Sequence, residues 1–159
     1  MSTILIPMFA VLLASAPAFA TDYTGRFAKY ETTVKTGAGP ELTAGESEIR
    51  VLGLDQASQK FTVQVLHRNP QGVEEKSISL FTASELDGQM QGTIFNHCVE
   101  NYGVSAEVVI VKNTSFQTCR IHSSNTSMDV ALVPFSIVKS TSKGTGGKVF
   151  TTLLTDFQI

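Results

Sequence analysis

Four side chains in the sequence combine the ligand types that zinc prefers. His97 is followed directly by Cys98, and Cys119 precedes His122 by three positions, so the chain offers two thiolates and two imidazoles. Neither spacing matches a familiar zinc motif, and on a strand Cys119 and His122 point to opposite faces. In an exported protein, two cysteines most simply form one disulfide. We therefore predict a Cys98–Cys119 disulfide, two incidental surface histidines, and no metal or cofactor.

Two further features raise the question of catalysis. His67 and Glu74 could supply the histidine and carboxylate of a hydrolytic triad, which also needs a nucleophile within hydrogen-bond reach, whereas the alternative is a simple cross-strand pair. The sequence contains no G-x-S-x-G elbow, and its serines are too numerous to nominate one. Residues 142–148 resemble a phosphate-binding loop, but Ser142 stands where the motif requires glycine, and Val149 follows the lysine. We predict no catalytic residue, and hence a protein that is not an enzyme.

The first 20 residues carry no charge. Residues 4–13 are an apolar run broken only by Pro7, and the segment ends in Ala18-Phe19-Ala20 before polar Thr21. This pattern is typical of a secretory signal peptide cut after Ala20, although no Lys or Arg precedes the run. The run is shorter than the roughly 20 residues that span a bilayer. We expect a signal peptide at 1–20, a single domain at 21–159 without a transmembrane segment, and a bacterial protein that is periplasmic or secreted.

The composition favours a β-rich domain. The 159 residues are 42% hydrophobic and 16% charged, with a net charge of −2. This balance excludes collagen-like, disordered and coiled-coil proteins and provides no basic surface for nucleic acid. Ser, Thr and Val are frequent, and turn residues recur at short intervals, which indicates strands. The sequence predicts a mainly β fold, a curved antiparallel sheet, half-barrel or barrel of about 7–8 strands.

The clearest hairpin covers residues 60–81. Its centre, Asn69-Pro70-Gln71-Gly72, is typical of a type I turn, because proline fixes φ at the second position and glycine occupies the fourth. The register that follows sets Phe61 opposite Leu80 and His67 opposite Glu74, a cross-strand pair near the turn.

A second hairpin is predicted at residues 104–121, around Asn113-Thr114. Its register sets Val111 opposite Phe116, Val108 opposite Cys119 and Glu107 opposite Arg120, and the opposed charges support it. Further strands are predicted at 26–35, 46–54, 129–135 and 148–157, with loops at 36–45, 123–127 and 140–147.

Within residues 86–103 the spacing of the apolar residues changes from the alternation of a strand to the spacing of a helix. Asp87-Gly88 predicts a turn, while apolar residues from Ile94 to Tyr102 recur at helical spacing and Gly103 suits a helix end. The alternative is a strand paired onto the next hairpin, in which an intervening strand would hold the cysteines about 9.5 Å apart. A disulfide needs Cα atoms roughly 4.4–6.8 Å apart. We therefore predict a short helix over residues 93–101, tied down by a bridge that contributes about 3 kcal/mol.

Two segments resemble the C-terminal half of small exported bacterial β-proteins of largely unassigned function: EVVIVKNTSFQTC at residues 107–119 and VPFSIVK at residues 133–139. Those proteins carry a TVPAGTF-x-TC hairpin and a VPFG-x-VK segment. The sequence departs from this pattern at residues 112–114, where Lys-Asn-Thr replaces Pro-Ala-Gly, and at Ser136, where the pattern has Gly. The resemblance implies a curved, half-barrel-like antiparallel sheet in a bacterial envelope protein, and it supplies no catalytic residue.

Aromatic residues carry the main functional hypothesis. A curved sheet can enclose a cavity that holds an apolar ligand or a lipid tail, whereas the alternative is that its aromatic side chains simply fill the core. The candidates are Phe27, Tyr30, Phe61, Phe81, Phe135, Phe150 and Phe157, of which Phe61, Phe81, Phe135 and Phe150 form the predicted ligand-binding set. Two other functions stay open: an envelope structural or protein-interaction module that uses a sheet edge or the 36–45 loop, and a hydrolase with an unrecognised site.

Overall fold

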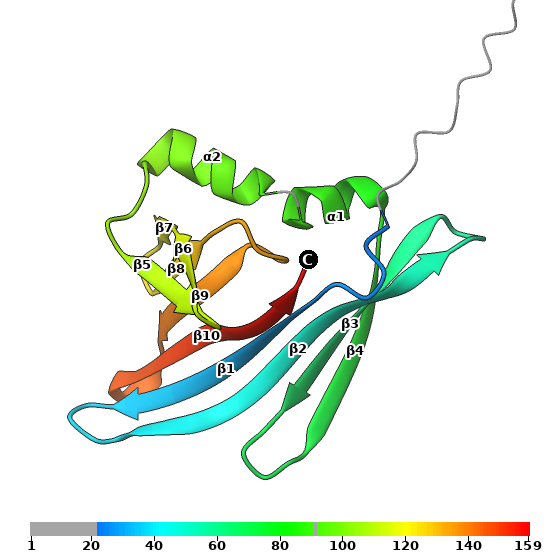
Figure 1. Ribbon diagram of the computed structural model, residues 1–159. Helices are drawn as coiled ribbons and strands as arrows, with labels where there is room; N and C mark the ends of the chain where they lie inside the picture. Colours follow the sequence, from blue (N-terminus) through cyan, green and yellow to red (C-terminus); the bar gives the residue numbers. More distant parts are fainter. Residues whose placement is uncertain (1–21, 91) are drawn as a thin grey trace, which may run out of the picture.

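The computed structural model describes residues 22–90 and 92–159, so the predicted signal peptide lies outside the described residues (Figure 1). In chain order the elements are β1 (Phe27–Thr36), β2 (Glu41–Asp55), β3 (Lys60–Arg68), β4 (Glu74–Phe81), α1 (Ala83–Met90), α2 (Thr93–Tyr102), β5 (Val108–Val111), β6 (Thr114–Gln117), β7 (Cys119–His122), β8 (Thr126–Val130), β9 (Ile137–Lys143), a 3₁₀ turn (Thr145–Gly147) and β10 (Lys148–Gln158). Within the described ranges, neither α-helix has the length and apolarity needed to cross a bilayer.

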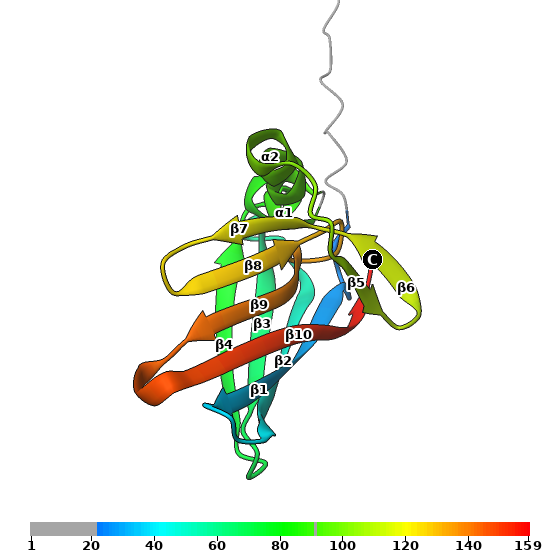
Figure 2. The same cartoon turned by 90° about the vertical axis from the view of Figure 1, so that its left-hand side faces the viewer.

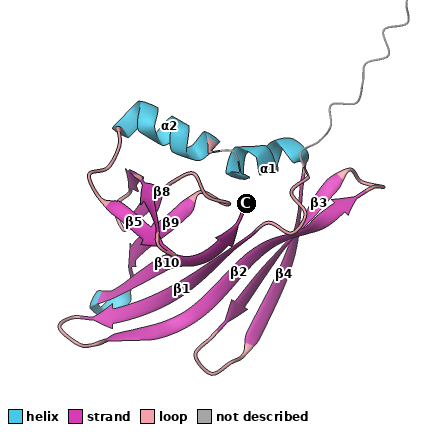
Figure 3. Ribbon diagram, viewed as in Figure 1, coloured by secondary structure: helices cyan, strands magenta, loops and turns pink. Residues whose placement is uncertain are grey.

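Eight strands form one antiparallel sheet in the order β4-β3-β2-β1-β10-β9-β8-β7, while β5 and β6 pair separately. Strands β4 and β7 are the two edges, so the sheet is curved but not closed into a barrel. Figures 1 and 3 show α1 and α2 placed end to end across the hollow side of the sheet, and Figure 2 shows β7–β10 crossing in front of β1–β4. The predicted mainly β, curved antiparallel fold is confirmed.

The main core lies on the concave face, which we define as the sheet face covered by α1. Strand β3 buries Phe61 and Val63 at alternate positions, as a strand with one covered face should. Leu86 of α1 and Leu154 of β10 are also buried there. Tyr23, which precedes β1, packs its ring edge-on against Phe61 with centroids 5.7 Å apart. Full burial of each such side chain contributes roughly 1.5–3 kcal/mol, and this fixes α1 on the sheet.

Helix α1 occupies the place where the sequence predicted a turn at Asp87-Gly88, so that prediction was wrong. Thr82 and Glu85 form a capping box, in which the Glu85 carboxylate accepts hydrogen bonds from the Thr82 backbone N–H (2.7 Å) and hydroxyl (2.9 Å). The Glu85 N–H donates back to the Thr82 hydroxyl at 3.3 Å. This T-x-x-E pattern begins a helix, and with Leu86 fully buried it outweighs the cost of about 1 kcal/mol that Gly88 brings.

The β3–β4 hairpin forms with a register one residue away from the predicted one. Phe61 lies opposite Phe81 rather than Leu80. The cause is the turn, because Gly72 has a φ of 81° and the Asn69 N–H donates to the Val73 carbonyl at 3.0 Å. The loop is therefore a type I turn extended by a left-handed glycine, which adds one residue. A slip of one residue turns β4 over, so that Ile78 and Leu80 lie on the opposite face from Phe61, while Phe81 lies on the same face.

The β5–β6 hairpin turns one residue earlier than predicted, at Lys112-Asn113 rather than Asn113-Thr114. Val111 lies opposite Thr114, and the predicted pairing with Phe116 was wrong. Lys112 and Asn113 both have positive φ, 46° and 64°, which is the backbone of a two-residue type I′ turn. A type I′ turn matches the twist of paired strands and usually contains glycine. Lys112-Asn113 contains none, so the sequence lacked the signal for this turn.

The chain leaves this hairpin directly for the large sheet. Cys119 begins β7, so the predicted pairing of Val108 with Cys119 was wrong, and Val108 lies opposite Gln117. Glu107 and Arg120 nevertheless form the expected ion pair. Because Arg120 lies in β7, this ion pair joins the base of the β5–β6 hairpin to β7 and does not link two opposite residues of the hairpin.

Residues 131–136 form a turn, buried except for Leu132, where a strand was predicted over residues 129–135. Strand β8 ends at Val130. The Ser136 N–H donates to the Val133 carbonyl at 2.9 Å, with Pro134 and Phe135 at the centre of the turn. Proline followed by a residue of positive φ is the backbone of a type II turn, and Phe135 has a φ of 61°. Buried Val133 and Phe135 imitate strand alternation, which explains the wrong prediction.

The other strand predictions hold with shifted ends. Strands β1, β2 and β10 cover the predicted strands at 26–35, 46–54 and 148–157, apart from Arg26. The loops predicted at 36–45, 123–127 and 140–147 are shorter than expected, because β2 begins at Glu41, β8 begins at Thr126 and β9 extends to Lys143. These Thr- and Ser-rich ends belong to the sheet because ladder hydrogen bonds, rather than apolar alternation, fix them.

Candidate ligand-binding groove

A groove of about 400 Å³ lies on the concave face, within the volume range of small-molecule sites. Four strands supply most of its lining, namely β1 and β2 from the first half of the chain and β9 and β10 from the last part. Helix α1 and the 131–136 turn supply the rest. The lining residues are Tyr30, Thr32, Ser47, Ile49, Gln89, Phe135, Ile137, Ser140 and Thr152. We call this site the concave groove.

The lining divides into apolar side chains and neutral hydroxyls. Ile49, Phe135 and Ile137 provide apolar surface, while hydroxyls come from Thr32 and Thr152. The Thr32 and Thr152 hydroxyls are hydrogen-bonded to each other across the sheet at 2.9 Å. None of the described lining residues is Asp, Glu, Lys, Arg or His. The groove is therefore suited to an uncharged ligand with an apolar part.

Phe135 is held at the groove by an unusual backbone. Phe135 and Ser136 both have a φ of 61°, in the left-handed region that disfavours side chains with a Cβ. The buried Ser136 hydroxyl donates to the carbonyl of Gln89 in α1 at 3.1 Å, which ties the turn to the helix. Such a conformation costs on the order of 1–3 kcal/mol and persists only where its surroundings enforce it. The strain accompanies an aromatic ring placed at the groove wall.

Tyr30 combines deep burial with an unsatisfied polar group. Its side chain is 6% exposed, and its hydroxyl is the buried side-chain atom that finds no hydrogen-bond partner among the described residues. Burial raises the pKa of this phenol well above its usual range, so the hydroxyl stays protonated. A buried hydroxyl without a partner costs about 1–3 kcal/mol, which an arriving acceptor would recover.

The predicted aromatic set is only partly brought together. Phe135 lines the groove, as does Tyr30 from the wider set of candidates. Phe61 belongs to the core against Tyr23, and Phe81 packs at the edge of that core. Phe150 lies two residues before Thr152 on β10, beyond the groove lining.

Groove residues that sequence reasoning missed are mostly polar or aliphatic. Ser47, Ser140 and Gln89 resemble ordinary surface positions in the sequence, and Ile137 lies in a strand that was not predicted. The signal that was available is the VPF turn at residues 133–135, because it carries both the strained backbone and the aromatic wall.

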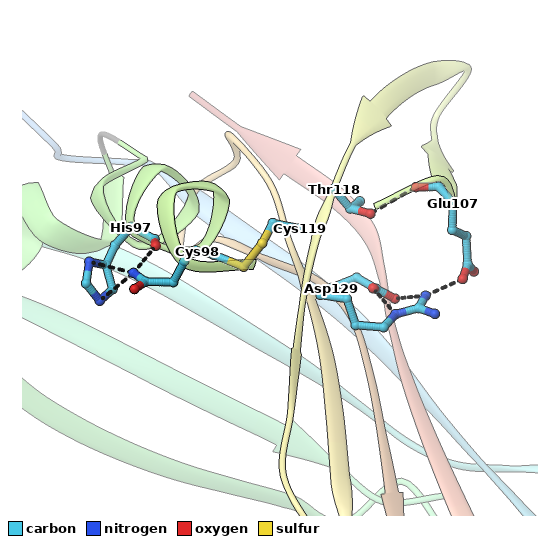
Figure 4. The surroundings of a disulfide bond; sticks show 8 residues. His97, Cys98, Glu107, Thr118, Cys119 and Asp129 are labelled. Carbon is cyan, nitrogen blue, oxygen red and sulfur yellow. Dashed lines mark hydrogen bonds and ion pairs between the residues drawn. A yellow bond between two sulfur atoms is a disulfide. The ribbon is translucent and has the colours of Figure 1, made fainter. Parts of the chain in front are cut away.

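The predicted disulfide between Cys98 and Cys119 is present, with Cα atoms 5.9 Å apart (Figure 4). Helix α2 covers the predicted residues 93–101 and ends before Gly103, whose φ is 74°. The bridge joins α2 to β7, and both cysteines are buried. Their sulfurs are therefore committed to each other rather than to a metal. On α2, the side-chain amide of Asn101 donates to the His97 carbonyl at 2.7 Å.

His67 and Glu74 do not form the predicted pair. His67 lies opposite Glu75, because of the one-residue register difference, and Glu74 forms an ion pair with Arg68. The Nδ1 atom of His67 lies instead 3.0 Å from the Ser47 hydroxyl. This is the spacing of a nucleophile and its base, but among the described residues no carboxylate is hydrogen-bonded to His67 to complete a triad.

A second hollow, of about 540 Å³, lies between the two helices and β7. Its lining includes Ile94 and Cys98 of α2 and Ile121 of β7. The lining is mainly apolar, but it includes the ionisable side chains of Glu85 and His97. We treat this hollow as the competing location for an apolar ligand.

Comparisons with known proteins give only distant likenesses. No protein-family model and no curated protein matches the sequence. Among solved structures, the chain is similar to MucB, solved in complex with MucA(peri), at 11% identity and a TM-score of 0.44; the match covers 86% of this chain and 50% of that one. This chain thus spans half the length of that protein. It is also similar to a LolA superfamily protein from Nitrosomonas europaea, at 8% identity and a TM-score of 0.26, with 86% of each chain covered.

Proposed function

We propose that this chain is an exported bacterial binding protein, not an enzyme, whose concave groove holds an apolar or amphipathic ligand such as a lipid tail. The observation that carries the proposal is the groove itself, about 400 Å³ in volume and lined by neutral residues from distant parts of the chain. The strained turn that holds Phe135 supports it, because strain of this kind concentrates at ligand sites. The leader-like first 20 residues support a periplasmic or secreted location.

The test is titration with N-phenyl-1-naphthylamine, an uncharged fluorophore that brightens in apolar sites. Ser140→Phe places a large side chain in the groove, and we expect it to weaken binding by at least about 10-fold. Ser142→Phe is the matched control, because it lies two residues further along the same face of β9, outside the groove lining. Equal binding by both variants, or no binding by the wild type, would overturn the proposal.

A protein-interaction role is the second candidate, and the edge strand β4 favours it. Its outer backbone edge is unpaired, and Ile78 and Leu80 are 57% and 53% exposed. An exposed strand edge is a surface to which an extended peptide can add as another strand. The Asn69–Val73 hydrogen bond sets the N–H of Ser77 and Ser79 toward β3 and that of Lys76 toward the open edge. If this role is the main one, then Lys76→Pro abolishes partner capture without changing fluorophore binding.

The hydrolase alternative has a direct test in the same preparation. Ser47 and His67 are the residues that would act. We expect the wild type to hydrolyse p-nitrophenyl esters no faster than Ser47→Ala. Faster hydrolysis that disappears in both Ser47→Ala and His67→Ala would make this protein an enzyme.

A further inference from the structure

The unpartnered Tyr30 hydroxyl narrows the chemistry of the ligand. This inference rests on the proposed binding function. Tyr30 comes from the middle of the sheet, where it lies opposite Leu154 on one side and Ser47 on the other. It lines the concave groove, and its side chain is more than nine-tenths buried. Its hydroxyl has no acceptor among the described residues.

Three of the other lining hydroxyls take part in hydrogen bonds. Thr32 and Thr152 are hydrogen-bonded to each other at 2.9 Å, and Ser47 lies 3.0 Å from the His67 ring. Tyr30 differs from them because its hydroxyl is buried and has no partner among the described residues. An unsatisfied buried donor is costly, and native proteins usually retain one where another molecule satisfies it.

The lining also restricts the charge of the ligand. No cationic or acidic side chain is among the described lining residues of the groove. A carboxylate or phosphate placed there would lose its hydration without gaining a countercharge, which is strongly unfavourable. A neutral ester or alcohol loses far less hydration and can accept a hydrogen bond from Tyr30. Ile49, Phe135 and Ile137 then cover the attached apolar chain.

We propose that the groove selects uncharged amphiphiles that carry an ester, amide or hydroxyl oxygen next to an apolar chain, and that Tyr30 donates its hydroxyl hydrogen to this oxygen. The hydroxyl is covered in the free protein. The ligand reaches it by the side-chain rotamer changes that commonly accompany binding. Tyr30 thus acts as a specificity determinant that distinguishes neutral heads from anionic ones.

The experiment compares 1-monolauroylglycerol with lauric acid, below their micelle concentrations, as competitors of N-phenyl-1-naphthylamine at pH 8. The two share an acyl chain and differ in head charge. We expect the neutral ester to displace the fluorophore at the lower concentration. Tyr30→Phe should weaken displacement by the ester by about 2- to 10-fold, the contribution of one hydrogen bond, after correction for the fluorophore affinity measured for each variant.

Two controls keep the outcomes distinct. Tyr30→Phe removes an unpartnered hydroxyl, so its urea midpoint should equal or exceed that of the wild type. A second readout uses ester labelled with ¹³C at the carbonyl, whose bound chemical shift should move in Tyr30→Phe.

If the fluorophore binds and Ser140→Phe blocks it, but Tyr30→Phe leaves ester displacement and the carbonyl shift unchanged, this inference is wrong and the binding function stands. Equal or stronger displacement by lauric acid in the wild type would also overturn it. No fluorophore binding to the wild type would overturn the binding function and this inference together.

Discussion

Removal of the Cys98–Cys119 bridge should lower the stability of the protein substantially. The cysteines are 21 residues apart in the sequence. A cross-link that closes a loop of this length removes unfolded-state entropy worth about 3 kcal/mol at 25 °C. Total stabilities of small domains are about 5–15 kcal/mol, so the bridge supplies a large share. The pair is buried beside Val130, so reduction also exposes an apolar contact when α2 detaches.

The assay is urea unfolding followed by far-UV circular dichroism, since the chain has no tryptophan. The comparison is between oxidised wild type, reduced wild type and the Cys98→Ala/Cys119→Ala double variant. With a denaturant slope of about 2 kcal/mol per molar urea, a loss of about 3 kcal/mol lowers the midpoint by about 1.5 M. Reduced wild type keeps both sulfur atoms, so it separates the loss of the cross-link from the loss of side-chain volume.

Helix α2 provides a local readout of the same change. Amide hydrogens within α2, such as that of Asn96, should exchange faster in the reduced protein than those of β1, because α2 loses its covalent attachment to β7. If the urea midpoint is the same with and without reductant, then the bridge does not constrain the chain as described. Uniform acceleration of exchange in α2 and β1 would contradict the local role assigned to the bridge.

Two other predictions concern the β5–β6 hairpin. Asn113→Gly should raise the free energy of unfolding by about 0.5–1 kcal/mol, because Asn113 has a φ of 64° in a type I′ turn that favours glycine. The neighbouring substitution Lys112→Ala should not raise it. The urea midpoints of the two variants and the wild type test this prediction. Hydrogen bonds from Lys139 and Arg120 lower the pKa of Glu107 to about 2, from about 4.5 when unfolded. The stability contributed by ionised Glu107 is thus complete above pH 4.5 and lost as the pH falls towards 2. Glu107→Gln should flatten the decline of the urea midpoint over that range, and an unchanged pH profile would exclude this ion pair as a contributor.

The sequence was informative where one strong constraint acted locally. Helix α2 could be predicted because its apolar spacing and the cysteine pair excluded a strand, and both the helix and the bridge are present. The Thr82-x-x-Glu85 capping box is a sequence signal for helix α1, whereas the Asp87-Gly88 pair indicates a turn. Glycine inside a helix costs only about 1 kcal/mol, which burial of one side chain readily offsets.

Strand registers were predicted less well because they depend on one backbone dihedral. At Gly72 a positive φ adds a residue to the loop, and positive φ at both Lys112 and Asn113 places the turn of the other hairpin one residue earlier. Residue types alone allow either geometry at each turn. Each slip reassigns every cross-strand pair, which is why the His67–Glu74 pair was wrong.

The groove could not be predicted from the sequence, because its lining residues come together only through the pairing of strands that are distant in the sequence. Ser47 and Ser140 line one site although they are far apart in the sequence, because β1 pairs with β10 and brings the two halves of the chain together. Aromatic content pointed to Phe135, Tyr30 and Phe61, and all three are buried in the same core, but Phe61 is absent from the groove lining.

The most direct test of the binding site is an NMR titration of isoleucine-methyl-labelled protein with 1-monolauroylglycerol. Ile49 and Ile137 line the concave groove, whereas Ile94 and Ile121 line the hollow beside α2. We predict that the methyl signals of Ile49 and Ile137 shift with a common saturation curve, while those of Ile94 and Ile121 stay in place. Shifts confined to Ile94 and Ile121, or no shifts at saturating ligand, would contradict the concave groove as the binding site.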